Sequence, residues 1–522
     1  MPGDKIFIDH LNRKFRIPAP KNLIKPPDDI QFASKSKPWK IYFGMLGTVL
    51  PAFFLLYTSL FLILGIINLN PIVTLSGGIC SLPLLIIIFR LHRPKLIHVR
   101  VATPSEDGDY IHPLTTGGSI ETNVRTNFSR FIIRDDSILE MPPSKQLWVL
   151  FCLVITVGII SSFVFLSNVS HELGIILFII IAIPMWFIGF SLPVLAWWGT
   201  STQLLGIPTR KRDAEAWLLA GMMAAFPAFL FNSFVAPLII PDNFPIWASD
   251  LSLLALSAPF CEELFKGLAV AIFLPSIKGP KHGFQIGFTV GLGFALIENF
   301  QYIGISLIGG PLGITLTILV RGIGSIPGHA VWTAITGTAI GWLAVDSKFK
   351  EKLQMYANKI TIGTVDLDED TGDDIDGDGN YSDYEGNKYN SDVATIESLE
   401  KMSTSQKPWL LMDKNSEVIT NQFNSNSTLQ NKKLVNNIFP KASANIGLST
   451  PKSVINALLL AMMGHSFWNG SSYISYYIPQ MQNFTTYEST LISVTWTIIL
   501  VFGIIFTTTQ LLRGVVAIDE EK

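Results

Sequence analysis

The chain has 522 residues, of which 49% are hydrophobic and only 15% are charged. Soluble globular proteins carry about 25% charged residues, and the mean hydropathy here is +0.40, so the composition excludes a wholly disordered chain and a single water-soluble domain. The net charge of −2 excludes a strongly basic nucleic-acid binder.

Apolar runs long enough to cross a bilayer recur along the chain, since a spanning helix needs about 20 such residues. The eighth run is too long for one helix. It contains Arg321 and the helix breakers Pro327 and Gly328, so we expect a short helix followed by a full span. We predict an all-α, polytopic transmembrane helix bundle of about ten spans, at 41–67, 72–89, 146–166, 174–198, 214–240, 249–274, 283–308, 312–346, 453–477 and 488–512.

The basic residues indicate how the chain crosses the membrane. Lys and Arg fall on one set of connections, whereas the alternate connections contain none. The positive-inside rule therefore predicts that both termini are cytoplasmic. We expect a multi-pass integral membrane protein and assign it to the cell membrane. The connections without Lys or Arg are 68–71, 167–173, 241–248, 309–311 and 478–487.

Two longer polar stretches interrupt the spans. Residues 101–145 contain short apolar pieces and form either a small hairpin or a loop, and residues 347–452 are acidic and then rich in Ser, Asn and Lys, which predicts a largely disordered cytoplasmic insertion. The predicted order is a cytoplasmic segment (1–40), a transmembrane hairpin (41–100), a cytoplasmic loop (101–145), a second transmembrane hairpin (146–200), the first part of a membrane core (211–346), the acidic insertion (347–452) and the last part of the core with a closing span (453–512).

Ionisable side chains within the spans are confined to the second half of the chain. A charge at the centre of a bilayer costs roughly 2.5–3.5 kcal/mol, so such residues are candidates for function. The cores of spans one to four contain none. Glu262, Glu298 and His465 lie near the middle of their spans, and at about 1.5 Å per residue they can meet in one layer. The ionisable residues of spans six to nine are Glu262, Glu263, Lys266, Glu298, Arg321, His329 and His465.

These residue types suit hydrolysis of a peptide bond. The reaction needs a base to activate water, an acid for the leaving amine and donors for the developing oxyanion. Two adjacent carboxylates push their pKa values apart, so Glu262 and Glu263 can supply a base and an acid. His329 and His465 could shuttle protons or bind a metal, and Asn469 could donate to the oxyanion. The alternative is a buried ion-pair network that only joins helices.

Four motifs follow one another, each on its own hydrophobic segment. They are EExxK at 262–266, FxxxE at 294–298, a Pro-Gly-His sequence ending at His329, and HxxxN at 465–469. In this order they resemble the PrsW family of intramembrane proteases. That family is related to the CAAX prenyl endopeptidases, which carry EExxxR and FxxxH in the corresponding places. Lys266 and Glu298 place this chain on the PrsW side. The resemblance covers roughly 211–346 and 453–478.

The resemblance implies an intramembrane endopeptidase that hydrolyses a membrane-anchored protein, such as a single-span regulator, in regulated intramembrane proteolysis. Glu262 would be the water-activating base, Glu263 its partner and Asn469 the residue that assists the oxyanion. The resemblance completes the catalytic centre with His329, His465, Glu298 and Lys266. Zn²⁺ could be held by His329, His465 and Glu298. A metal-free glutamate mechanism is equally compatible, since the chain has no HExxH motif.

The acidic insertion contains a calcium-loop pattern. Residues 374–385 fit D-x-D-x-D-G-x5-E, in which the acidic side chains of Asp374, Asp376, Asp378 and Glu385 would surround Ca²⁺. No amphipathic helix clearly flanks the pattern, so a solvated acidic linker is the alternative interpretation.

Two other functions use the same buried carboxylates. A transporter or proton-coupled channel would show repeated halves with broken helices, but spans one to five do not resemble spans six to ten. A non-catalytic membrane scaffold of protease ancestry would lack a motif residue, and none is missing. The expected partners are therefore a membrane protein substrate and the lipid bilayer, and no nucleic acid.

Overall fold

The computed structural model describes residues 5–8, 14–17, 38–91, 96–113, 119–134, 139–166, 171–346, 409–412 and 447–518. The chain divides into two compact units, which are described separately. One comprises residues 1–36, 92–138 and 387–424, and the other comprises 37–91, 139–386 and 425–522. The predicted calcium loop at 374–385, and most of the predicted insertion at 347–452, lie outside the described residues.

The first unit is built from β-strands. Two short strands, β1 (Lys5–Ile8) and β2 (Lys14–Ile17), pair antiparallel. A second sheet has the order β4-β3-β5, with β3 at Leu96–Pro113, β4 at Ser119–Arg134 and β5 at Trp409–Met412. Both of its pairings are antiparallel. Of the two alternatives for 101–145, the structure therefore forms the hairpin, and its first strand begins earlier than the predicted segment.

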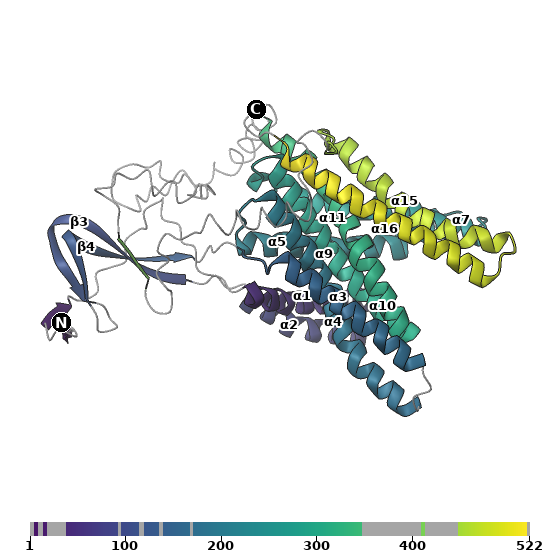
Figure 1. The fold of residues 1–522 in the computed structure, drawn as a ribbon, viewed down its shortest axis with the longest axis horizontal. Coiled ribbons are helices and arrows are strands. Elements are labelled where there is room, and N and C mark those ends of the chain that lie inside the picture. Colours follow the sequence, from purple (N-terminus) through teal and green to yellow (C-terminus); the bar gives the residue numbers. More distant parts are fainter. Residues whose placement is uncertain are drawn as a thin grey trace. The chain divides into compact units, whose positions relative to one another are not determined.

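The second unit is helical (Figure 1). It begins with two helical hairpins, α1 (Pro38–Ile67) with α2 (Pro71–Leu91) and α3 (Ser144–Leu166) with α4 (His171–Leu205). The next part comprises α5 (Lys211–Leu230), the π-helical segment η1 (Phe231–Val235), α6 (Ala236–Ile239), α7 (Ile246–Leu251), the π-helical segment η2 (Ser252–Ser257), α8 (Ala258–Ala271) and η3 (Leu274–Ser276).

The remaining helices complete this unit. The eighth predicted span is divided into α10 (Gly310–Val320) and α11 (Ile326–Val345), which a π-helical segment, η5 (Arg321–Ser325), joins. The others are α9 (Pro280–Ser306), η4 (Leu307–Gly309), α15 (Val454–Met481) and α16 (Thr486–Val516).

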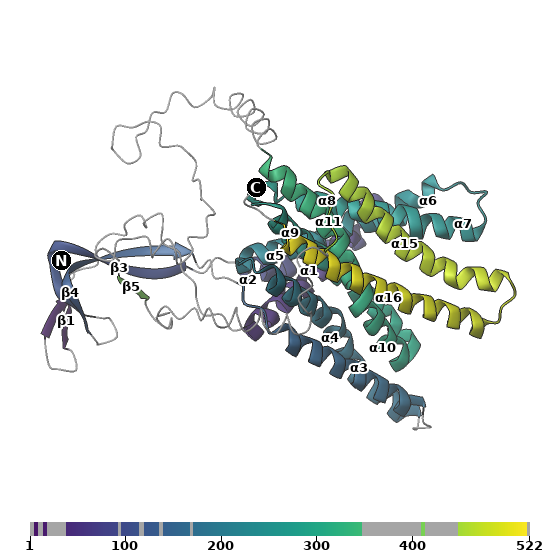
Figure 2. The same cartoon turned by 45° about the horizontal axis from the view of Figure 1, so that its top comes forward.

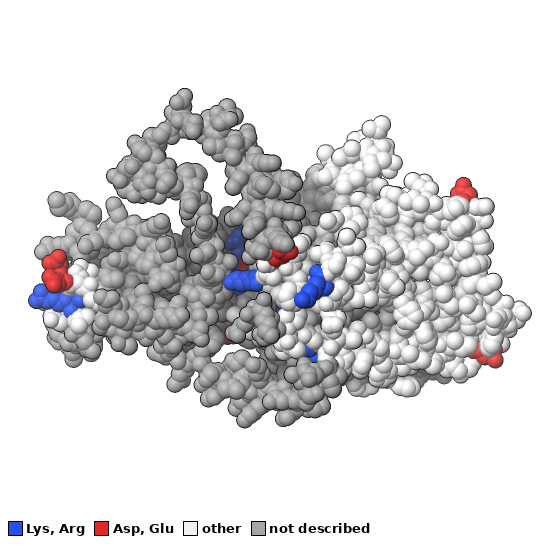
Figure 3. All heavy atoms as spheres, turned by 90° about the horizontal axis from the view of Figure 1, so that it is seen from above, with Lys and Arg blue, Asp and Glu red and all other residues white. Residues whose placement is uncertain are grey.

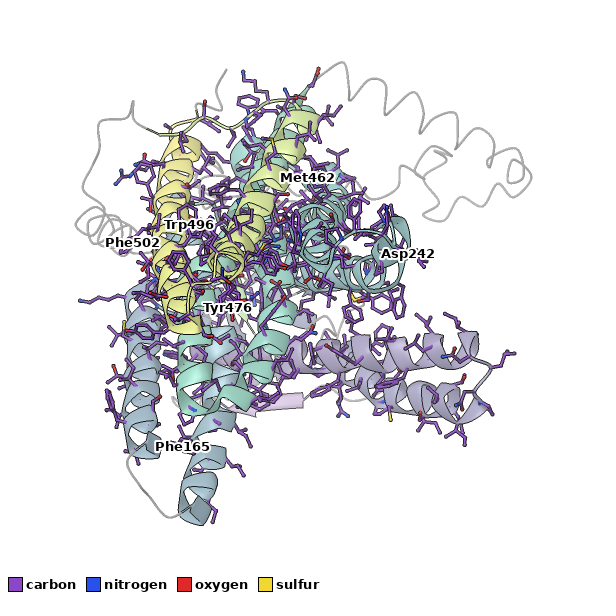
Figure 4. All side chains as sticks on the ribbon, turned by 90° about the vertical axis from the view of Figure 1, so that its right-hand side faces the viewer. Phe165, Asp242, Met462, Tyr476, Trp496 and Phe502 are labelled. Atoms are coloured by element: carbon purple, nitrogen blue, oxygen red, sulfur yellow. The ribbon has the colours of Figure 1, made fainter. Side chains whose placement is uncertain are left out.

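The helical surface is suited to lipid. Among the described residues, seven helical stretches are long and apolar enough to cross a membrane. Large apolar side chains such as Phe165 and Phe502 are exposed on the outer faces of the helices (Figure 4), and a broad part of the surface in Figure 3 shows no charged side chain. The chain is thus a multi-pass integral membrane protein of the predicted helical class. The β-strands of the first unit are not part of the predicted all-α class. The number of ten spans and the cytoplasmic termini stay predictions.

Helix α9 forms the centre of this unit, between α5 and α11 (Figures 1 and 2). Gly283, Gly287 and Gly291 recur every four residues and lie against α11. A Cβ at Gly287 would be 2.6 Å from the backbone oxygen of Thr333. Small residues at this spacing allow two helix backbones to approach closely in a membrane. The close packing fixes the position of α9 relative to α11, and both helices carry motif residues.

Candidate active site

Helix α8 carries the EExxK residues on one face. Glu262, Glu263 and Lys266 are all buried, and Lys266 has no solvent-exposed surface. Its Nζ lies 2.8 Å from Glu263 Oε1 and 3.5 Å from Glu262 Oε2, as the i,i+3 and i,i+4 spacings predict. The ammonium group also lies 3.9 Å from the centre of the Phe294 ring on α9, a favourable cation–π arrangement. The lysine therefore bridges the glutamate pair to α9.

Glu263 contacts polar side chains of three helices. Its Oε1 contacts Lys266 Nζ and lies 3.0 Å from His465 Nδ1 on α15. Its Oε2 lies 3.5 Å from the hydroxyl of Thr333 on α11. Because its partners come from three helices, Glu263 joins α8, α11 and α15 at one point.

Glu262 differs from its neighbour. Its Oε2 is buried and has no hydrogen-bond partner. Its nearest charged partners are Lys266 Nζ at 3.5 Å and His465 Nε2 at 3.9 Å, both beyond ordinary hydrogen-bond length. This oxygen is therefore free to accept a hydrogen bond from a water molecule or to bind a cation.

Glu298 on α9 belongs to a second group of contacts. Its Oε2 lies 2.6 Å from His329 Nε2 and 2.7 Å from Arg321 Nη2. His329 Nδ1 lies 2.9 Å from Lys266 Nζ. Since an ammonium group can only donate, Nδ1 must accept, and His329 then carries its proton on Nε2, the nitrogen that lies 2.6 Å from Glu298 Oε2. His329 thus connects the Glu298 group with the EExxK residues.

The two histidines lie side by side. The ring centres of His329 and His465 are 4.9 Å apart and nearly perpendicular, and His465 stacks on Trp332 at 4.6 Å. The structure therefore brings six predicted site residues into one network from α8, α9, α11 and α15, namely Glu262, Glu263, Lys266, Glu298, His329 and His465.

Asn469 makes a different contact. Its Nδ2 donates a hydrogen bond of 3.1 Å to the backbone oxygen of Leu254, within η2. This π-helical segment leads directly into α8, so Asn469 holds the backbone that precedes the EExxK motif. The predicted role of Asn469 as an oxyanion donor stays a prediction.

The sequence interpretation did not assign Arg321 or Thr333 to the site. Arg321 gave a signal, because it is a charge within a predicted span. Thr333 gave none, since hydroxyl side chains are common within membrane helices and usually bond to their own backbone, as Thr333 also does to His329 O.

A metal ion fits part of this network. One ligand atom each from Glu262, His329 and His465 lies within 4.8 Å of the other two. Three protein ligands of these types are typical of catalytic zinc sites, and the Glu262 oxygen without a hydrogen-bond partner suits a cation. The predicted set contained Glu298 as its carboxylate. In the structure Glu298 contacts Arg321 and His329, and Glu262 completes the cluster.

Residues 214–365 match a family model described as PrsW family intramembrane metalloprotease. Comparison of the chain with curated proteins and with solved structures gave no match. The family match confirms the resemblance given by the motifs. It supports an intramembrane protease, a hydrolase acting on a membrane protein substrate within the bilayer, and does not favour a transporter. The matched range contains Glu262, Glu298 and His329, whereas His465 enters the network from outside it.

Proposed function

We propose that the protein cleaves a membrane-anchored protein with a water molecule that Glu262 activates. The unpartnered, buried Oε2 of Glu262 carries this proposal. A general base must be able to accept a hydrogen bond from the water that it deprotonates. Glu263 is less suited to this step, because its Oε1 already lies 2.8 Å from Lys266 Nζ and 3.0 Å from His465 Nδ1.

The neighbouring residues have supporting roles in this mechanism. Glu263 holds His465 at 3.0 Å, and Glu298 holds His329 at 2.6 Å, so each histidine is oriented by a carboxylate. Lys266 places a positive charge beside both glutamates of α8, where it balances their negative charge. For Asn469 to assist the oxyanion, its amide would have to exchange Leu254 O for the substrate.

A metal-dependent version uses the same residues. Glu262, His329 and His465 would hold Zn²⁺, and the bound ion would supply a Lewis acid that activates water. Glu263 and Glu298 would then keep the two histidine ligands oriented, as carboxylates commonly do around zinc, and Lys266 would have to release His329 Nδ1, the nitrogen left for the ion. We also propose, from the resemblance, that the substrate is a single-span protein of the cell membrane and that its cleavage is regulated.

The test uses the full-length protein reconstituted in lipid with a single-span reporter. We expect Glu262→Gln to lower the cleavage rate by roughly 10²–10⁴-fold, the usual range for a general base. His465→Ala should cause a comparable loss. The matched control is Glu140→Gln, which removes an exposed carboxylate and should leave the rate unchanged. Undiminished cleavage by Glu262→Gln would overturn the proposal.

Zinc dependence is measured on the same preparation. In the metal version, a chelator abolishes cleavage, and His465→Ala lowers the zinc content of the purified protein. In the metal-free version, the chelator leaves the rate unchanged. Glu262→Gln inactivates the protein in both versions, so the role of Glu262 is tested separately from the metal.

A further inference from the structure

Arg321 joins η5 to three residues on one turn of α9. Its Nη2 lies 2.7 Å from Glu298 Oε2, and its Nε donates to Asn299 Oδ1. Its guanidinium group lies 4.0 Å from the centre of the Tyr302 ring. The Glu298 oxygen that Arg321 contacts is the same one that His329 Nε2 contacts. The position of Arg321 therefore determines where the carboxylate holds the histidine.

Helix α4 contacts the backbone on both sides of this arginine link. Trp197 Nε1 donates a 2.9 Å hydrogen bond to the oxygen of Gly322, the residue after Arg321. Trp186 Nε1 donates a 2.8 Å hydrogen bond to the oxygen of Phe300, the residue after Asn299. The two tryptophans are three helical turns apart, so they lie on one face of α4. Through these two hydrogen bonds, one face of α4 holds the backbone of η5 next to Arg321 and the backbone of α9 next to Asn299.

The packing around these hydrogen bonds leaves little space. A Cβ at Gly322 would be 2.7 Å from the Phe151 ring on α3, and a Cβ at Gly189 on α4 would be 2.5 Å from Ile318. Apolar packing alone would bring these helices together. It does not explain why both indole N–H groups are directed at backbone oxygens next to the arginine link.

We propose that Arg321 is a positioning residue of the active site, and that α4 holds it in place through Trp186 and Trp197. This inference rests on the proposed protease function. It assigns a role to the spans that precede the family match, because α4 lies outside residues 214–365. Arg321 acts through Glu298 and His329, so its loss should lower kcat and leave KM unchanged.

The test compares Arg321→Gln, Trp197→Phe and Trp186→Phe in the full-length, reconstituted protein. Each Trp→Phe change keeps an aromatic ring and removes one donor. We expect a fall in kcat of about three- to tenfold for each tryptophan and of about 10- to 100-fold for Arg321→Gln, from the usual worth of neutral and charged hydrogen bonds. Arg321→Lys, which keeps the charge, should restore part of the loss.

The matched control is Trp148→Phe. The Trp148 indole donates from α3 to the hydroxyl of Thr200 on α4 at 3.3 Å, and its ring centre lies 5.1 Å from that of Trp197, so the change keeps an aromatic ring against Trp197 and removes a donor that is not directed at the arginine link. It should therefore change kcat little.

A readout independent of cleavage is the rate at which a carbodiimide labels Glu298, measured by mass spectrometry. Labelling should rise in the order Trp148→Phe, Trp197→Phe, Arg321→Gln, because the carboxylate loses its fixed partner.

The outcomes separate this inference from the proposed function. If Trp197→Phe and Trp186→Phe match Trp148→Phe in both kcat and Glu298 labelling, the role of α4 is refuted. A rise in KM alone for Arg321→Gln would make Arg321 a substrate-binding residue and also refute the inference. If the labelling order holds but Glu262→Gln still cleaves the reporter, the proposed function fails and the positioning of Glu298 by α4 stands.

Discussion

Helix α4 and the motif-bearing helices α8, α9, α11 and α15 use polar side chains in opposite ways. The indoles of Trp186 and Trp197 on α4 donate to backbone oxygens of other helices. The charged side chains of the motif-bearing helices pair with one another, as Lys266 does with Glu263. The charged network and the indole donors that hold the backbone beside it therefore come from separate parts of the chain.

The largest expected loss of stability comes from disrupting the charged network of the motif-bearing helices. Lys266→Met removes the only Lys or Arg side chain that contacts both glutamates of α8 among the described residues, and a buried charge without its partner costs about 3–5 kcal/mol of unfolding free energy. The measurement is reversible unfolding in detergent. The control is Lys211→Met, at a partly exposed pair with Glu215, which should cost at most about 1 kcal/mol. Equal effects would mean that the buried network contributes no more than a surface pair.

A smaller effect concerns the close packing of α9 against α11. Gly287→Ala places a Cβ 2.6 Å from Thr333 O, which should lower stability by about 1–3 kcal/mol through overpacking. Gly503→Ala on α16 is the control, because no atom lies within 4 Å of its Cβ, and it should not destabilise the protein. If both variants unfold at the same temperature, the close approach of α9 and α11 does not constrain the site.

Asn469 is an exception among the motif residues, because it donates to a backbone oxygen as the tryptophans of α4 do. Asn469→Ala therefore tests whether such a donor on a motif-bearing helix has only a structural role. Loss of one neutral hydrogen bond should lower stability by about 0.5–1.5 kcal/mol. If Asn469 only holds η2, the fall in kcat should be no larger than about tenfold. A fall of more than 100-fold with unchanged stability would instead favour its role as an oxyanion donor.

The smallest effect lies outside both regions, in the hairpin of β3 and β4. His112 is buried with Nε2 2.6 Å from Thr126 Oγ1, and burial lowers its pKa below the usual 6.5. The folded hairpin therefore favours the neutral form, so its stability is complete above about pH 6.5 and falls as the pH drops through the lowered pKa. The hydrogen-exchange protection factors of β3 and β4, which correct for the slower intrinsic exchange at low pH, should be lower at pH 5 than at pH 7.5, and His112→Asn should remove this difference.

The sequence was enough to predict those features of the candidate site that depend on residue spacing within a helix. The i,i+3 and i,i+4 positions placed Glu262, Glu263 and Lys266 on one helix face, and depth along the spans placed Glu298 and His465 in the same layer. The cost of burying charge in a membrane was enough to make these residues candidates for function. For the same reason, the sequence indicated that Arg321 was important without showing its partner.

The contacts that distinguish similar residues could not be predicted, because they depend on distant parts of the chain. Glu262 and Glu263 are adjacent, yet only Glu263 lies within hydrogen-bond length of His465, which is 202 residues away. Glu262, His329 and His465 each have a ligand atom within 4.8 Å of the other two, whereas Glu298, the carboxylate of the predicted set, contacts His329 and Arg321. Indole donors such as Trp197 show no pattern in an apolar sequence, since tryptophan also serves as an interface residue at the ends of membrane spans.

The π-helical segments η2 and η5 immediately precede the helices that carry Glu262 and His329. A π turn holds about one residue more than an α turn, and one residue corresponds to about 100° of rotation around a helix axis. The wider turn absorbs this rotation, so loss of one residue within either segment would restore regular α-helical winding and leave the flanking helices at nearly the same rotation. Asn469 and Trp197 each donate to a backbone oxygen within one of these segments, so such a deletion would act on the charged network through these two hydrogen bonds rather than through a turned helix.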